Sequence, residues 1–251
     1  MAELASTSEI SKHPTKDEIY QSLLAHDAST FFEGKPAVDI PRAAVLIPLF
    51  FKNEELYVLL TVRSQHLSTH GGDVAFPGGK QDEADADIVK TALREAEEEI
   101  GLPQDQVEVI SKVVPSFAKH GILVTPIVGF ISEDFVPQPN PDEVECAFSV
   151  PLADFLSDEN HTSQPGTWQD RPYRLHFFHH PCTTKAGKKI VTWGLTAFMA
   201  MVVASMIYKR PPNFETDNWF NWENPTKAAE ESYFIFLRRN GYLEQQEGSK
   251  L

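Results

Sequence analysis

Glutamate side chains crowd into one short stretch of the sequence, which runs LREAEEEIGL from position 93 to 102. On a helix each residue turns by about 100°, so Glu98 lies roughly 60° behind Glu95 and Glu99 about 40° ahead of it. Glu97 points elsewhere. Three carboxylates at this spacing repel one another unless a cation lies among them, and their oxygens suit a hard divalent metal. The spacing therefore predicts a metal site at Glu95, Glu98 and Glu99; the alternative is an ordinary solvent-exposed charged face.

Two neighbouring features favour the metal site over the exposed face. Arg94 precedes Glu98 by four residues, close enough on a helix to hold its carboxylate. Upstream, Pro77, Gly78 and Gly79 predict a tight loop whose glycines let the backbone approach a phosphate or a metal. The neighbours therefore indicate a binding site for such a group.

The glutamates require a helix to position them, and the sequence supplies one over residues 87–101. Its inner face is the apolar stripe of Ile88, Ala92 and Ala96. Gly101 is placed to end the helix as a C-cap.

Strand-like segments lie on both sides of that helix. The first two are dense in Val, Leu and Phe and are separated by a turn-like KNEE, which predicts a hairpin or adjacent strands. Further helices are expected at 15–29, 195–207 and 225–241. The expected strands are 43–51, 56–63, 71–76, 106–114, 122–131, 143–150 and 173–180. This order predicts an α+β fold, with a mixed sheet between helices in an α/β/α sandwich.

Composition limits the class of protein. The chain has 251 residues, 41% of them hydrophobic, which suffices for one sizeable core with extensions. We expect an N-terminal helical extension over 1–37, one domain over 38–240 and a mobile tail over 241–251. The formal charge of −14 argues against a nucleic-acid surface, so a polyanionic substrate would need a metal. The two cysteines, Cys146 and Cys182, favour a reducing compartment over a disulfide framework.

Three segments bear on where the protein resides. The stretch 191–209 is almost uncharged, but its length and small polar residues fit a buried helix better than a membrane span, so no span is expected. The N-terminus lacks the apolar core of a signal peptide. The sequence finishes in Ser249-Lys250-Leu251, an address recognised by the peroxisomal import receptor. We therefore expect the peroxisomal matrix as the location and that receptor as a partner.

A resemblance to a known family rests on these same residues. The segment GGKQDEADADIVKTALREAEEEIGL, residues 78–102, resembles the signature of the Nudix hydrolases. Upstream, LLTVRSQHLSTHGGDVAFPGG, residues 59–79, is similar to an additional signature of the coenzyme A diphosphatase branch, and so is WGLTA at 193–197. Asp85 stands nine residues before Arg94, where the general family pattern has a Glu at eight. Ser68 replaces an arginine that the branch usually has, which affects the expected grip on phosphates and not the metal site.

The resemblance implies a Nudix-like fold and hydrolysis of a nucleoside diphosphate linked to another group, with Mg²⁺ or Mn²⁺ as cofactor. It implies as metal ligands Glu95, Glu98, Glu99 and the carbonyl of Gly79. Its catalytic candidates are Glu98, Arg94 and Glu143, of which Glu98 or the loop carboxylate would help to activate water. Its candidates for substrate contacts are Arg63, Lys80 and Gly78. The alternative for Glu143 is a solvated turn acid, and for the two basic residues ordinary surface charge.

The substrate follows from the branch signature and the peroxisomal address together. Both indicate coenzyme A or acyl-coenzyme A, cleaved to 3′,5′-ADP and 4′-phosphopantetheine or its acylated form. The alternatives are a Nudix diphosphatase of NADH or ADP-ribose, and a non-catalytic nucleotide-binding regulator. The complete set of Arg94, Glu95, Glu98 and Glu99 argues against the regulator, because binding alone does not need it.

Overall fold

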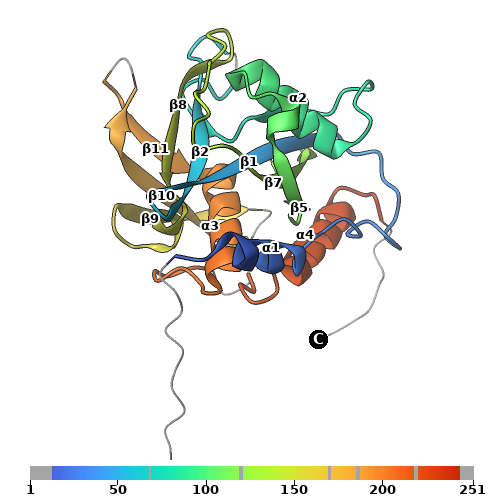
Figure 1. Cartoon of the computed structure of the whole chain (residues 1–251). Coiled ribbons are helices and arrows are strands. Elements are labelled where there is room, and N and C mark those ends of the chain that lie inside the picture. The colour runs from blue at the N-terminus through green and yellow to red at the C-terminus, as the bar shows by residue number, and fades with distance from the viewer. Residues whose placement is uncertain are drawn as a thin grey trace, which may run out of the picture.

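A mixed sheet of eight strands runs through the middle of the molecule (Figure 1). The computed structural model describes residues 13–67, 69–118, 121–168, 171–184, 187–217 and 220–243. The strands of the main sheet are β1 (Arg42–Lys52), β2 (Glu55–Arg63), β3 (Val74–Ala75), β4 (Gly78–Lys80), β5 (Glu108–Lys112), β6 (Ser116–Phe117), β7 (Leu123–Phe130) and β8 (Val144–Pro151). Strands β3, β2, β1, β7 and β5 are neighbours in that order, and β4, β6 and β8 pair with β1, β7 and β2. β1 and β7 are parallel and the other pairs are antiparallel, so the sheet is mixed as predicted.

The first two strands form the predicted hairpin. Lys52 pairs with Glu55 across a two-residue turn of Asn53 (φ +51°) and Glu54 (φ +66°). Positive φ at both central positions is the geometry that matches the twist of paired strands. This hairpin is continued by β8, which pairs with β2 along most of its length and brings its own start beside Arg63.

Helices cover both faces of the sheet, which confirms the α/β/α sandwich. Helix α2 (Ile88–Ile100) lies on one face, while α1 (Lys16–Leu24), α3 (Gly194–Tyr208) and α4 (Pro225–Arg239) lie on the other (Figure 1). Two apolar cores fill the gaps between these layers. The smaller core joins α2 to the sheet through residues that include Ala92, Ala96 and Leu46, all fully buried. The larger core holds the other three helices against the opposite face.

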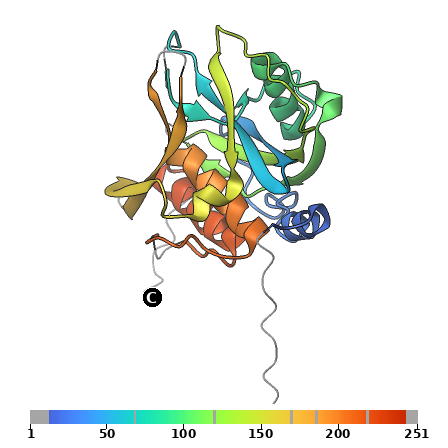
Figure 2. The same cartoon turned by 60° about the vertical axis from the view of Figure 1, so that its left-hand side comes forward.

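A second sheet was only partly expected from the sequence. Its strands are β9 (His161–Trp168), β10 (Arg171–Thr183) and β11 (Lys189–Trp193), with β10 in the centre. Figure 2 shows this sheet standing beside the main one, and β11 runs directly into α3. The sequence predicted neither β9 nor β11, and only the middle of β10. Residues of β9 are mostly exposed and include a proline and a glycine, so the strand lacks an apolar alternation.

The apolar stretch 195–207 is a buried helix, as expected. Most side chains of α3 are buried in the larger core. Across the described ranges, no helix has the length and hydropathy to cross a membrane. Two short 3₁₀ turns, η1 (Gln104–Gln106) and η3 (Leu152–Leu156), complete the described elements.

The helix expected near the N-terminus docks onto the same core as the rest of the chain. Ile19 and Leu23 of α1 are fully buried there. Its first turn is capped by Thr15 and Glu18, each accepting a hydrogen bond from the backbone of the other. The divisions at 37 and 240 stay predictions. Ser249-Lys250-Leu251 lies outside the described residues, as does Ser68.

Candidate active site

Helix α2 begins and ends where the sequence predicts. The carboxylate of its N-cap, Asp87, accepts hydrogen bonds from two backbone N–H groups of the first turn, at 2.8 and 2.9 Å. At the other end, Gly101 has φ +68°, the left-handed conformation that suits glycine at a helix terminus. Ala92 and Ala96 are fully buried, with Ile88 packed partly against the same core. The expected inner stripe is confirmed, and it turns the acidic face of the helix toward β4 and β2.

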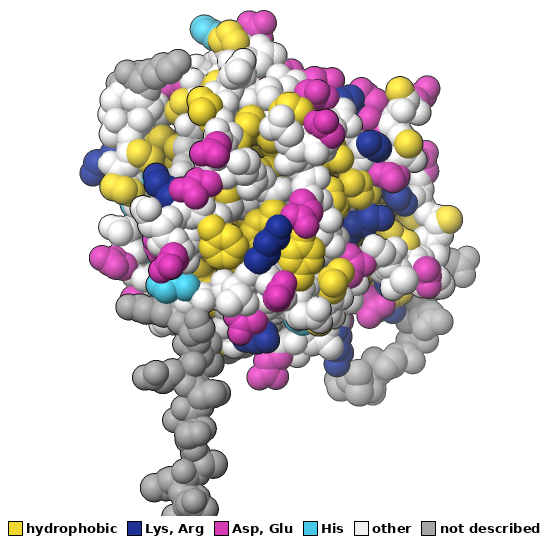
Figure 3. Space-filling view, in the orientation of Figure 1, with side chains coloured by type: hydrophobic (Ala, Val, Ile, Leu, Met, Phe, Trp, Pro, Cys, Tyr) yellow, Lys and Arg dark blue, Asp and Glu magenta, His cyan; other side chains and the backbone are white. Residues whose placement is uncertain are grey.

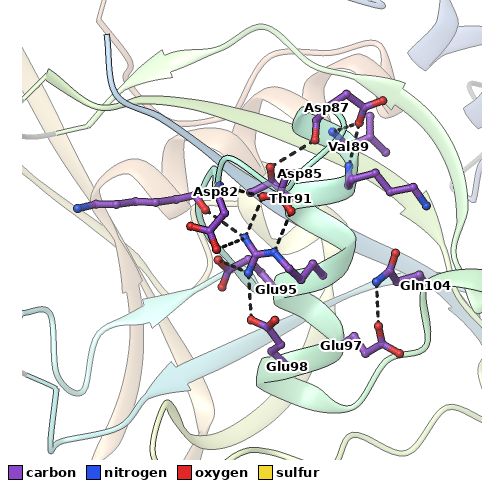
Figure 4. A network of polar contacts seen from close by, with 12 residues as sticks. Asp82, Asp85, Asp87, Val89, Thr91, Glu95, Glu97, Glu98 and Gln104 are labelled. Carbon is purple, nitrogen blue, oxygen red and sulfur yellow. Dashed lines mark hydrogen bonds and ion pairs between the residues drawn. The ribbon is translucent and has the colours of Figure 1, made fainter.

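The three carboxylates of that face differ in how deeply they are buried. The side chain of Glu99 is 6% exposed, that of Glu95 17% and that of Glu98 52%. Glu97 lies on another side of the helix, where it accepts a hydrogen bond from Nε2 of Gln104 at 2.9 Å (Figure 4). The predicted separation of Glu97 from the other three is confirmed.

Arg94 holds the acidic residues together. Its Nη1 donates to Glu95 Oε1 and to Glu98 Oε2, both at 3.0 Å, which confirms the expected contact four residues along the helix. Its Nε and Nη2 donate to the two carboxylate oxygens of Asp85, at 2.9 and 3.0 Å (Figure 4). Nη2 also donates to the backbone carbonyl of Lys80 at 3.2 Å. One guanidinium therefore fixes two glutamates, the acidic loop before α2 and strand β4.

Asp85 is a buried partner of Arg94 to which the sequence analysis gave no role. Its side chain is 5% exposed, and its two oxygens meet Arg94 in a bidentate pair. The hydrogen bond from Arg94 holds the pKa of Asp85 well below its usual range, and that ion pair raises the pKa of Arg94 in turn. The sequence signal for this contact was an acidic residue at the unusual spacing of nine residues before Arg94. From that position the aspartate side chain reaches the arginine directly.

The glycines upstream of α2 lie in a strand and not in the expected tight loop. Gly78 and Gly79 belong to β4, which pairs antiparallel with β1 so that Gly79 lies opposite Ala44. A Cβ atom at Gly79 would lie only 2.4 Å from Oε1 of Glu95. The absence of a side chain lets the backbone lie directly against this carboxylate. The expected approach of this backbone to a phosphate or a metal stays a prediction.

Glu99 is the buried end of the acidic face. Its carboxylate accepts a hydrogen bond from the N–H of Gly78 at 3.3 Å and lies 3.8 Å from Nη1 of Arg63. Burial raises the pKa of Glu99 to about 8; the charge of Arg63 and the hydrogen bond from Gly78 act against this rise, and the charges of Glu95 and Glu143 add to it. The predicted substrate residues Arg63 and Gly78 therefore lie beside a predicted metal ligand.

The segment 138–143 holds the end of α2 and the candidate base in place, a role that sequence analysis missed. Backbone N–H groups of Gln138 and Asn140 donate to the carbonyls of the last turn of α2, at 2.8 and 2.9 Å. The side chain of Asn140 also donates to Glu143 at 3.3 Å. The carbonyl of Glu143 accepts from the N–H of Ser64 at 2.8 Å, next to Arg63. Glu143 thus lies between the end of α2 and the residue that follows Arg63, and its role as a base stays a prediction.

Lys80 is the last residue of β4. Its backbone carbonyl accepts a hydrogen bond from Nη2 of Arg94, while its side chain is exposed at the end of the strand. A role in gripping phosphate stays a prediction for this residue.

The donor set suits a hard divalent cation. Its members are carboxylate oxygens and a backbone carbonyl, and acidic side chains gather over the region of α2 in Figure 3. Within the described part of the chain, no three His, Cys, Asp or Glu side chains converge closely enough to hold a metal as they stand. In this arrangement Arg94 lies between Glu95 and Glu98, so their carboxylates must turn to share a cation. The ligands Glu95, Glu98, Glu99 and Gly79 fit chemically and stay predictions.

Gly79→Ala is expected to lower hydrolytic activity at least tenfold while leaving most of the protein folded. The new methyl group would push the Glu95 carboxylate out of position, because the contact of 2.4 Å cannot be kept. Steady-state rates over a range of Mn²⁺ concentrations measure this, with circular dichroism as the check on folding. Gly166→Ala is the matched control for glycine replacement, since Gly166 also lies in a strand without a positive φ and its Cβ would meet nothing nearer than 3.5 Å. Wild-type rates in Gly79→Ala would show that the close approach is unimportant.

Comparison with known proteins agrees with the motifs. The family model described as "NUDIX domain" matches residues 40–172. The chain is 46% identical to Nudix hydrolase 15, mitochondrial, of Arabidopsis thaliana over 69% of this chain and 61% of the relative. It is 41% identical to the peroxisomal coenzyme A diphosphatase NUDT7 of Mus musculus over 70% of this chain and 74% of that one.

A third relative is Nudix hydrolase 22, chloroplastic, of Arabidopsis thaliana, 44% identical over 69% of this chain and 57% of the relative. The matches thus span about three fifths of the length of the two plant proteins and about three quarters of the mouse protein. The family match and the mouse relative each cover enough to decide the family. The chain belongs to the Nudix hydrolase family.

Proposed function

We propose that the chain hydrolyses the diphosphate bond of coenzyme A and acyl-coenzyme A, giving 3′,5′-ADP and 4′-phosphopantetheine or its acylated form. The observation that carries this proposal is where the segment 59–79 lies. This segment resembles the coenzyme A branch, and it places Arg63 and the N–H of Gly78 against Glu99. The part of the sequence that resembles the coenzyme A branch therefore adjoins the acidic face of α2.

The mouse relative supports the substrate, because its name specifies coenzyme A diphosphatase. The names of the two plant relatives specify no substrate. Support for the coenzyme A group therefore comes from one relative and one signature, whereas support for a hydrolase comes from the family as a whole.

The chemistry that the proposal requires matches the site. Nudix hydrolases generally use divalent metal ions, and here we propose Mg²⁺ or Mn²⁺, which would neutralise charge on the diphosphate and lower the pKa of a water molecule. The chain itself would orient the reaction through Arg94, which fixes Glu95 and Glu98. Arg63 is placed to meet a phosphate beside Glu99. Glu98 and Glu143 are the candidates to accept the proton of the attacking water.

The raised pKa of Glu99, a proposed metal ligand, predicts that the stability of the protein depends on pH. Burial raises its pKa in the folded protein from the usual 4.5 to about 8. The contribution of the neutral Glu99 carboxyl to the free energy of unfolding is therefore fully present below about pH 4.5 and is lost as the pH rises toward 8. Glu99→Gln keeps a neutral side chain at every pH, so in chelator its melting temperature should exceed that of wild type by a margin that grows from pH 5 to pH 8.

Thermal unfolding at several pH values measures that margin. A margin that stays constant between pH 5 and 8 would contradict the raised pKa. In the presence of Mn²⁺ or Mg²⁺, Glu99→Gln should also lose most of the hydrolytic activity, because the variant lacks the negative charge of a proposed metal ligand.

The substrate is tested by a screen at equal concentrations. Coenzyme A, an acyl-coenzyme A, NADH and ADP-ribose are each incubated with the protein and Mn²⁺ or Mg²⁺, and turnover is compared. The proposal expects the coenzyme A compounds to be cleaved at least tenfold faster than the others. Faster cleavage of NADH or ADP-ribose would replace the substrate and keep the enzyme class. Binding without cleavage of any compound would favour the non-catalytic regulator.

We also propose the peroxisomal matrix as the location, through Ser249-Lys250-Leu251 and the import receptor. The names of the relatives differ in location, since one is peroxisomal, one mitochondrial and one chloroplastic. Deletion of Leu251 from a chain with a fluorescent protein at its N-terminus should move the fluorescence to the cytosol and leave catalysis unchanged. Peroxisomal fluorescence after the deletion would remove this proposal.

A further inference from the structure

The segment WGLTA at 193–197 has no role in the proposed reaction as described so far. It joins β11 to α3, with Trp193 at the N-cap and Gly194 as the first residue of the helix. Gly194 has φ +64°, and a Cβ there would meet nothing within 4 Å, so the backbone conformation alone calls for glycine. This sharp start aims the first turn of α3 at the edge of the main sheet.

Thr196, in that first turn, reaches across to the main sheet. Its Oγ1 donates a hydrogen bond to the carbonyl of Val74 at 3.1 Å. Val74 lies in β3, the two-residue strand that ends the main sheet on this side. A carbonyl on an edge strand has no further strand to pair with, and the threonine hydroxyl supplies a donor. The second of the two coenzyme A-type motifs thus holds the first in place.

Val74 stands between two backbone links that lead to Glu99. On its N-terminal side, the carbonyl of Asp73 accepts from the N–H of Arg63 at 2.9 Å, and the carbonyl of Arg63 accepts from Gly72 at 3.0 Å. These bonds set the position from which the Arg63 guanidinium approaches Glu99.

On the C-terminal side, the chain passes from Val74 through the buried Phe76 to Gly78. The N–H of Gly78 donates to Glu99 at 3.3 Å. A shift of β3 would therefore disturb both the ion pair from Arg63 and the hydrogen bond from Gly78 to this carboxylate.

We propose that Thr196 is a positioning residue for the substrate-binding edge of the active site. Its hydroxyl fixes β3 so that Arg63 and Gly78 together present a cationic group and an N–H beside Glu99. The inference rests on the proposed function for its substrate, and on the hydrogen bond to Val74 for its geometry. The hydroxyl of Thr196 donates to β3, so we expect its effect to reach the acidic residues through that strand.

The same contact could serve only to attach α3, and the size of the helix core separates the two roles. Most of α3 is buried in the larger core, which holds the helix independently of one half-buried hydroxyl. Loss of a single hydrogen bond of this kind therefore costs little of the total stability. A positioning role, in contrast, changes the affinity for substrate.

The experiment compares Thr196→Val, which keeps the shape and loses the hydroxyl, with Thr196→Ser, which keeps the hydroxyl. Steady-state kinetics with coenzyme A and Mn²⁺ are measured on the full chain, along with thermal unfolding. Thr196→Val should raise KM about three- to tenfold with kcat changed less than about twofold, as expected for one lost hydrogen bond. Thr196→Ser should restore KM to near the wild-type value. Both melting temperatures should stay within a few degrees of wild type.

Amide hydrogen exchange without substrate provides a second measurement that does not depend on the reaction. Residues 72–79 should exchange faster in Thr196→Val than in wild type or Thr196→Ser, while α2 keeps its protection. Unchanged exchange in Thr196→Val would overturn the proposal, and so would equal impairment of KM in both variants. If wild-type protein fails to cleave coenzyme A, the proposed function falls, and hydrogen exchange still decides whether Thr196 fixes β3.

Discussion

Glu98→Gln is expected to fold normally and to lose about 10²- to 10⁴-fold in hydrolysis. The carboxylate has two proposed tasks, to bind the metal and to help activate water, and an amide performs neither well. Folding should survive because the side chain is 52% exposed and its contact is a single ion pair to Arg94. Steady-state turnover in saturating Mn²⁺ measures the loss, and thermal unfolding measures the fold.

Glu97→Gln is the matched control from the same turn of the helix. Its carboxylate meets Gln104 on another side of α2, away from Arg94 and β4 (Figure 4). The same loss of charge should therefore leave turnover within about twofold of wild type. Near-wild-type activity in Glu98→Gln, or equal losses in both variants, would remove Glu98 from the proposed mechanism.

The largest expected effect on stability comes from Arg94→Met. This change removes the partner of Asp85, whose side chain is 5% exposed, and leaves that carboxylate buried without its two charge-assisted hydrogen bonds. Removing one member of a buried ion pair costs about 3–5 kcal/mol, and we expect about 2–4 kcal/mol because Arg94 is itself 23% exposed. Activity should fall as well, since Glu95 and Glu98 lose the group that orients them.

A double-mutant cycle separates the two contributions to that effect. In Arg94→Met with Asp85→Asn, the buried charge is gone, so urea unfolding should recover more than half of the lost stability. Activity should remain low, because the contacts of Arg94 to the glutamates are still missing. No recovery of stability in the double variant would show that the pair with Asp85 is not what makes Arg94 important.

Local sequence signals were sufficient to predict the helix that carries the acidic face. Helix α2 has an apolar stripe, an N-cap aspartate and a C-cap glycine, and each of these acts within a few residues. The same holds for the hairpin, because Asn53 and Glu54 close a turn between two strongly apolar strands. The structure confirms that the three glutamates of that face lie on one helix and that Arg94 contacts Glu98, while their roles in the reaction stay predictions.

The remaining features depend on partners distant in the sequence. Strand β4 forms because β1 lies beside Gly78 and Gly79, and nothing in the glycines themselves distinguishes a strand from a loop. Strand β9 lacks apolar alternation and exists because β10 pairs with it. The hold of segment 138–143 on the end of α2 uses backbone groups, which carry no mark in the sequence.

The proposed hydrolysis of coenzyme A is tested most directly by identifying the products formed when coenzyme A is incubated with the wild-type chain and Mn²⁺. Mass spectrometry should detect 3′,5′-ADP and 4′-phosphopantetheine in equal amounts, with neither product formed in chelator or by Glu98→Gln. Intact coenzyme A after prolonged incubation would contradict the proposed function. So would products that arise from cleavage of coenzyme A at any bond other than the diphosphate.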